Sequence, residues 1–120
     1  MKLFTKAILA RLPALYSNEN KKAADVIVHV KLFVASATWY ITEYNPDEKL
    51  AFGFVNLGDA DMAELGYISI TELEQLEVPV NVRHGNQVMR VGSSKVERDR
   101  FFVPCSLEYV MREIKAGNHV

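Results

Sequence analysis

The chain has 120 residues, of which 49% are hydrophobic and 24% charged, and its formal net charge is −1. This composition excludes extensive disorder, and the length indicates a single domain over residues 1–120. The charge is uneven, because residues 1–31 carry +4, residues 32–82 carry −8 and residues 83–100 carry +3. The acidic middle argues against wrapping nucleic acid around that part of the chain.

Cysteine usage and hydropathy limit the chemistry and the location. Cys105 is the single cysteine, so the sequence excludes an intramolecular disulfide, a zinc knuckle and a CxxC pair. The basic and apolar residues 1–12 lack a signal-peptide cleavage site, and no stretch approaches the ~20 apolar residues of a membrane span. We therefore expect a cytoplasmic protein without a membrane segment.

The N-terminal part of the chain predicts a helix and then a strand. Leu3, Ala7 and Ile8 lie near helical spacing, and Pro13 cannot continue a helix, so we expect the helix to end near Arg11. Residues 26–34 alternate with the period of a strand. One face of this predicted strand is entirely apolar and consists of Val26, Val28, Val30, Leu32 and Val34.

The second predicted strand, over residues 38–44, carries several aromatic side chains. Strand alternation places Trp39 and Glu43 on one face and Tyr40 and Tyr44 on the other. Each pair could therefore line a different site.

A meander continues the predicted sheet. Residues 45–48, Asn-Pro-Asp-Glu, suit a type I turn. Residues 50–55 predict a third strand, in which Gly53 indicates a bulge or a close approach by another segment. A loop over 56–63, with room for one helical turn, leads to a fourth strand over 64–70.

The next elements are a short helix and a hairpin. Thr71 and Glu74 fit a capping box, which predicts a helix start at Thr71. Residues 78–91 predict a hairpin that turns at 84–86, His-Gly-Asn. Residues 92–94, Gly-Ser-Ser, are expected to be a linker.

The C-terminal part predicts a strand over 95–103 that ends at Pro104, and then a helix capped by Ser106 and stopped by Gly117. The apolar stripe of this helix consists of Leu107, Val110, Met111 and Ile114. Together the elements predict an α+β domain with an antiparallel sheet of about five or six strands, flanked by N- and C-terminal helices.

Several strings resemble a widespread bacterial family that is labelled as a domain of unknown function. They are LPALY at 12–16, VHVKLF at 28–33, TWYITEY at 38–44, FGFV at 52–55, ELGYISITELE at 64–74 and VERDRFF at 96–102. The chain departs from the family at about 79–94, where the family has a shorter connection containing Pro and Gly. The resemblance implies a short protein carried on plasmids and integrative elements, and it names no activity.

Aromatic residues and carboxylates are candidates for a binding site. Trp39, Tyr40, Glu43 and Tyr44 could form an aromatic wall with a carboxylate that orients a ligand, and Tyr67 of the fourth strand joins this candidate set. The competing interpretation is structural: Trp39 is core, the tyrosines pack under a helix, and Glu43 lies at the rim.

A second candidate site consists of carboxylates. Glu97 and Asp99 share one face of a predicted strand, and Glu43 or Glu64 from a neighbouring strand could join them to bind a metal or transfer protons. An exposed strand with alternating charges is the competing interpretation. The spacing of the histidines and glycines indicates no zinc site, phosphate loop or cofactor.

Basic residues suggest a third site. Arg98 and Arg100 lie on the other face of the same predicted strand. Further cations and neighbouring aromatic residues are Arg83, Arg90, Lys95, Phe101 and Phe102. Such a set could contact a single nucleic-acid strand, although Glu97 and Asp99 lie among the cations.

The leading functional hypothesis is a non-enzymatic adaptor of a mobile element that binds a host or element-encoded protein. It rests on the lack of catalytic motifs, the small size and the segregated charges. A small metal-assisted hydrolase using Glu43, Glu64, Glu97 and Asp99 is one alternative, and it requires these carboxylates to converge. Single-stranded nucleic-acid binding through Arg98 and Arg100 is the other.

Overall fold

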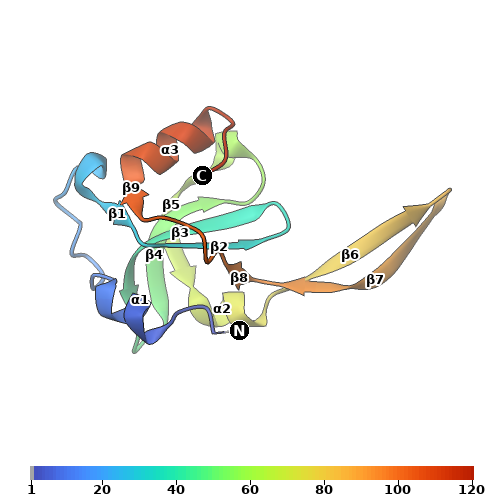
Figure 1. Ribbon diagram of the computed structural model, residues 1–120, viewed down its shortest axis with the longest axis horizontal. Coiled ribbons are helices and arrows are strands. Elements are labelled where there is room, and N and C mark those ends of the chain that lie inside the picture. The colour runs from blue at the N-terminus through green and yellow to red at the C-terminus, as the bar shows by residue number, and fades with distance from the viewer. Residues whose placement is uncertain (1) are drawn as a thin grey trace.

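An antiparallel sheet forms the centre of the fold in the computed structural model, which describes residues 2–120 (Figure 1). The strands are β1 (Ile27–Val28), β2 (Val30–Val34), β3 (Ala37–Asn45), β4 (Leu50–Asn56), β5 (Glu64–Ser69), β6 (Glu77–His84), β7 (Gln87–Lys95), β8 (Glu97–Arg98) and β9 (Cys105–Ser106). The helices are α1 (Lys6–Arg11), α2 (Ile70–Gln75) and α3 (Leu107–Lys115), with the 3-10 turns η1 (Ala23–Asp25) and η2 (Ala60–Met62). The central sheet has five strands in the order β5-β4-β3-β2-β8, which confirms the predicted α+β class.

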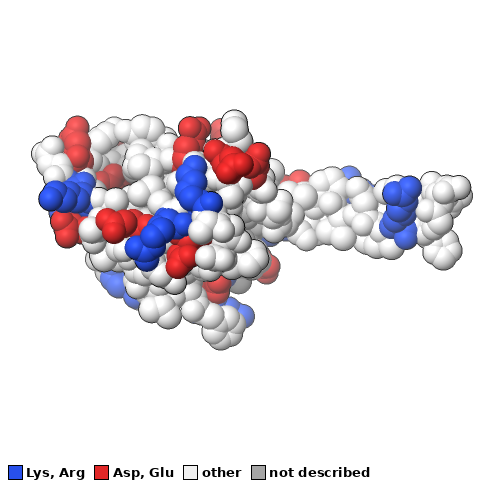
Figure 2. Space-filling view, turned by 90° about the horizontal axis from the view of Figure 1, so that it is seen from above, with Lys and Arg blue, Asp and Glu red and all other residues white. Residues whose placement is uncertain are grey.

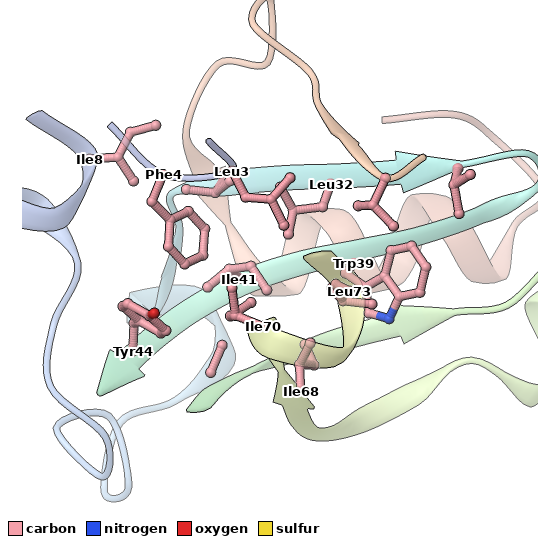
Figure 3. Close-up of a cluster of buried hydrophobic side chains, with 14 residues drawn as sticks. Leu3, Phe4, Ile8, Leu32, Trp39, Ile41, Tyr44, Ile68, Ile70 and Leu73 are labelled. Atoms are coloured by element: carbon pink, nitrogen blue, oxygen red, sulfur yellow. The ribbon is translucent and has the colours of Figure 1, made fainter. Parts of the chain in front are cut away.

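Two hydrophobic clusters lie on opposite faces of this sheet, so the body has three layers. Under one face, the N-terminal segment with α1 and α2 packs around Leu32, Trp39 and Ile41 (Figure 3). On the other face, α3 packs over Tyr40 and Phe54. Among residues 2–120, no helix is long and apolar enough to span a bilayer.

The predicted first strand is in fact two strands with a break at His29. β1 pairs with β9, whereas β2 pairs with β3 and β8. The predicted apolar face is buried throughout, but Val28 belongs to the cluster under α3 and Val30 to the opposite cluster. The prediction of one continuous face is therefore wrong, because the chain passes from one layer to the other at His29.

A β-bulge in β3 changes the predicted faces of its side chains. The register against β4 shifts between Ile41 and Glu43, which leaves Thr42 as the additional residue. Glu43 therefore does not share a face with Trp39. Tyr44 packs in the same cluster as Trp39, whereas Tyr40 packs in the opposite cluster. The alternation prediction is wrong beyond Ile41.

Gly53 pairs with Ile41, the last residue of β3 before this bulge, as a glycine in the strand interior predicts for a close approach. A Cβ atom at this position would lie 1.9 Å from the carbonyl oxygen of Tyr40. Only a residue without a side chain fits there, so the predicted close approach is confirmed.

The start of α2 differs from the sequence prediction. Ser69, and not Thr71, caps the helix by accepting a hydrogen bond from the Glu72 N–H. Glu74 binds Lys49 of the β3–β4 turn and does not reach back to close a capping box. Ser69 supplies the cap because β5 ends there, two residues earlier than the expected helix start.

The predicted hairpin is present and longer than expected. β6 and β7 pair from Glu77 opposite Lys95 to His84 opposite Gln87. The stretch 92–94, which was expected to be a linker, forms the lower part of β7. This two-stranded ribbon, residues 77–95, projects from the body (Figure 1) and is called the arm below.

After the arm, the expected strand over 95–103 is reduced to the two residues of β8. Asp99 ends it, because its carboxylate accepts a hydrogen bond from the Phe101 N–H and its carbonyl accepts one from Phe102. α3 begins at the predicted Ser106 cap and is followed by Gly117, whose φ of 86° confirms it as the stop residue.

Candidate functional site

A cavity of about 420 Å³ lies beside β5, between the loop after α1 and helix α3, and it is called the Tyr67 cavity below. Its apolar wall consists of Val26, Phe52, Leu65, Leu107 and Met111. Its polar lining includes Tyr16, Asn18, Glu19, Lys21, Glu43 and Tyr67. An apolar wall with a few polar groups is the usual composition of a ligand or peptide site.

Glu43 points into this cavity because of the bulge at Thr42. Its carboxylate accepts hydrogen bonds from the backbone N–H groups of Tyr16, at 3.1 Å, and Asn18, at 2.7 Å. Only 5% of the residue is exposed, and backbone donors compensate the burial of its charge. Glu43 therefore anchors the loop that forms the cavity rim.

The loop residue Tyr16 has a φ of 72°, in the left-handed region that non-glycine residues seldom adopt. Its side chain approaches Tyr67, and both rings are largely exposed. Hydrogen bonding with Tyr16, together with desolvation and the carboxylates of Glu43 and Glu19, raises the pKa of Tyr67. The Tyr67 ring packs edge-on against Phe52, with ring centroids 5.1 Å apart, so β4 supports this rim.

A second cavity, of about 430 Å³, adjoins the first and shares Leu65 and Tyr67 with it. Four exposed apolar side chains surround it and form what we call the β5 patch: Leu57, Met62, Leu65 and Tyr67. The acidic residues Asp59 and Glu64 also line this cavity, and Asp61 lies in the same short loop. The patch thus combines exposed apolar surface with negative charge.

The other predicted aromatic residues do not reach this site. Trp39 and Tyr44 are buried in the cluster with α1 and α2, and Tyr40 is buried under α3. Of the aromatic candidate set, only Glu43 and Tyr67 line a common cavity. The structural interpretation therefore holds for Trp39, and the wall expected around it is absent from the described residues.

The four carboxylates of the hydrolase hypothesis lie apart. Glu43 lines the Tyr67 cavity and Glu64 lines its neighbour on β5, whereas Glu97 and Asp99 lie at β8, the opposite edge of the sheet. Among the described residues, no group of three or more His, Cys, Asp or Glu side chains could hold a metal ion. The convergence that the hypothesis requires is not found for these residues.

The predicted basic residues at β8 have structural contacts. The guanidinium of Arg98 donates to the carbonyl oxygens of Lys2, at 3.0 Å, and Leu3, at 2.7 Å, and so holds the N-terminal segment. Asp99 pairs with Lys31 at 3.7 Å. Arg100 lines a cavity of about 380 Å³ that also contains Glu97 and Asp99, so cations and anions mix there.

Sequence patterns did not single out Tyr16, Leu65, Met62 or Met111 as site residues. Tyr16 lies in the LPALY string, and its loop reaches the sheet through the Pro13 carbonyl, which accepts a hydrogen bond from the Tyr44 N–H at 2.9 Å. A contact between a loop and a distant strand leaves no periodic pattern in the sequence, so it could not be predicted from one.

A family model described as "Protein of unknown function (DUF2958)" matches residues 3–107. The match covers most of the chain, so the chain belongs to this family, as the strings in its sequence predict. Neither the curated proteins nor the solved structures contain a match.

Proposed function

We propose that this member of the DUF2958 family is a non-enzymatic module that binds a partner protein through the β5 patch. The observation that carries the proposal is the exposure of four apolar side chains, Leu57, Met62, Leu65 and Tyr67, beside a sheet edge. Contiguous exposed apolar surface with a polar rim is typical of protein-interaction sites.

The edge position supports recognition of an extended segment. β5 is the last strand of the sheet, and among the described residues only β4 pairs with it. Its outer backbone groups are therefore available for an added strand. Leu65 and Tyr67 alternate along β5 and offer apolar contacts to every second side chain of such a segment.

The charges of the site favour a basic partner segment. Asp59, Asp61 and Glu64 lie around the patch, and Glu19 lies on the other side of Tyr67. Lysine or arginine residues that flank the apolar positions of the partner would complement these carboxylates and speed association. The proposed partner segment is thus extended, alternately apolar and flanked by cations.

The proposal includes a biological context that follows from the resemblance. In this context the protein is cytoplasmic and belongs to a mobile element, where it serves as an adaptor for a host or element-encoded protein. Engagement of one extended segment is compatible with a domain of this size, because strand addition needs no large preformed interface.

Site-specific photo-crosslinking tests the proposal directly. A benzophenone amino acid replaces Tyr67 in one variant and Phe101 in another, and each is irradiated in bacterial lysate with and without nuclease. Phe101 is the matched control, because it is an exposed aromatic residue close to β8, the opposite sheet edge. We expect a defined protein to crosslink at position 67 and not at position 101, with or without nuclease.

A pull-down with point variants provides the energetic test. Leu65→Glu should abolish retention of the crosslinked protein, because it places a charge in the patch. Val103→Glu places the same charge at an even more exposed apolar residue outside the patch and should retain the partner. Retention that disappears with nuclease would instead favour nucleic-acid binding, and no crosslink at position 67 would refute the proposal.

A further inference from the structure

The arm presents one apolar face to solvent. Register places Val82 opposite Met89, and alternation along each strand puts Val80 and Val91 on the same face. Val91 keeps this side because it is the additional residue of a bulge opposite Val80. These four side chains, called the arm face below, are 39–60% exposed.

The charged residues of the arm lie on its other face. Arg83 pairs opposite Val88 and Arg90 opposite Asn81, one step out of phase with the arm face. Glu77 and Lys95 form an ion pair at the base on this same charged side. Figure 2 shows the basic group near the free end of the arm. The arm face itself therefore contains no charged side chain.

The arm also lacks the support that a two-stranded ribbon usually needs. Its strands pair only with each other within residues 2–120, and of its apolar side chains only Val78, at the base, packs against the hydrophobic core. An isolated hairpin is marginally stable in water, and a third layer against its apolar face stabilises it. A partner that covers the arm face would therefore also order the arm.

We propose that the arm face packs against the arm face of a second copy of this chain, with the two arms antiparallel about a two-fold axis. The face is self-complementary, because in an antiparallel pair of arms Val82 and Met89 of one copy lie against Val80 and Val91 of the other. Arg83 and Arg90 of both copies then point outward, so like charges do not meet. Each body lies at the far end of the other arm.

The area of the arm face is sufficient for such a dimer. Strands of 8 and 9 residues give a ribbon about 27 Å long and about 10 Å wide with its side chains. Packing two such faces removes on the order of 1,000 Å² of accessible surface from water, which is below the ~1,200 Å² of stable specific interfaces and in the range of weak, transient ones. The dimer is consequently expected to be concentration-dependent and not permanent.

Sedimentation equilibrium of the full chain over a range of concentrations tests the proposal. The wild type should approach twice the monomer mass as concentration rises. Met89→Glu should sediment as a monomer, whereas Val88→Glu should dimerise like the wild type. These neighbours form a matched pair, because Met89 is 57% and Val88 63% exposed and they lie on opposite faces of β7.

Mixing two charge variants tests the pairing of arms. Met89→Glu and Met89→Lys should each be monomeric and should form a heterodimer when mixed, because position 89 lies next to the proposed axis. A monomeric wild type, equal effects of Val88→Glu and Met89→Glu, or no heterodimer in the mixture would each overturn the proposal. The readout is independent of the β5 patch, so it stands or fails separately from the proposed function.

Discussion

Glu43 and Tyr16, 27 positions apart in the chain, are joined by a hydrogen bond of 3.1 Å from the Tyr16 N–H to Oε1 of Glu43. The other carboxylate oxygen accepts from the Asn18 N–H at 2.7 Å. A single buried side chain of the central sheet thereby holds a loop that has no regular secondary structure and forms one rim of the Tyr67 cavity.

Removing this anchor should destabilise the protein and loosen the loop. Glu43→Ala leaves two partly buried N–H groups without their acceptor, and we expect a loss of about 1–3 kcal/mol in the free energy of unfolding. Urea denaturation measures the loss, and amide exchange at residues 16–18 should accelerate. Glu97→Ala, at an exposed position on β8, is the control and should change stability by less than about 0.5 kcal/mol.

Gly53, which pairs with Ile41 beside the β3 bulge, should not tolerate a side chain. Gly53→Ala places a Cβ atom 1.9 Å from the Tyr40 carbonyl oxygen, so backbone must move, and we expect a loss of about 1–3 kcal/mol or more. Gly66, its cross-strand neighbour on β5, has open space around the corresponding position. Gly66→Ala should therefore change stability by less than about 1 kcal/mol, and equal losses in both variants would refute the bulge geometry.

Burial of Val28 in β1 predicts a larger loss of stability than the substitutions at Glu43 and Gly53. Val28 is fully buried under α3, and Val28→Asp places a charge there among apolar side chains. We expect the domain to unfold, with a loss above about 4 kcal/mol in the free energy of unfolding. Ile27→Asp, at the exposed neighbouring position, should keep a cooperative melt by circular dichroism. Wild-type melting behaviour of Val28→Asp would contradict the assignment of this face.

The pH dependence of stability should include a contribution from His29. Burial, and to a lesser extent Arg11, lowers the pKa of His29 from its usual value of 6.5. As the pH falls below 6.5, the unfolded chain therefore binds a proton that the folded protein does not, and stability decreases until the pH drops below the folded pKa.

Thermal melts above and below pH 6.5 measure this loss of stability on acidification. His29→Gln should show a smaller decrease in melting temperature on acidification than the wild type does. His84→Gln, at the exposed end of β6 beside the hairpin turn, should follow the wild type. A wild-type decrease that persists unchanged in His29→Gln would assign the pH dependence to other groups.

Local sequence rules determined much of the fold. The Ser106 cap, the stop at Gly117 and the helix end near Arg11 are found where the sequence predicts them, and the hairpin turn lies at 85–86, within the predicted 84–86. Each depends on a few neighbouring residues: a cap hydroxyl, a residue free to adopt positive φ, or a proline that cannot donate a hydrogen bond. Such interactions involve residues that are close together in the sequence, so the sequence alone predicts them.

Tertiary structure alone decided how these elements present their side chains. One additional residue at Thr42 turned Glu43 away from Trp39 and into the Tyr67 cavity, and the break at His29 divided one apolar run between two cores. Alternation within a strand is a local property, but which face is covered depends on the layers packed against it. The same reason applies to the arm, whose apolar side chains are exposed because no described layer covers them.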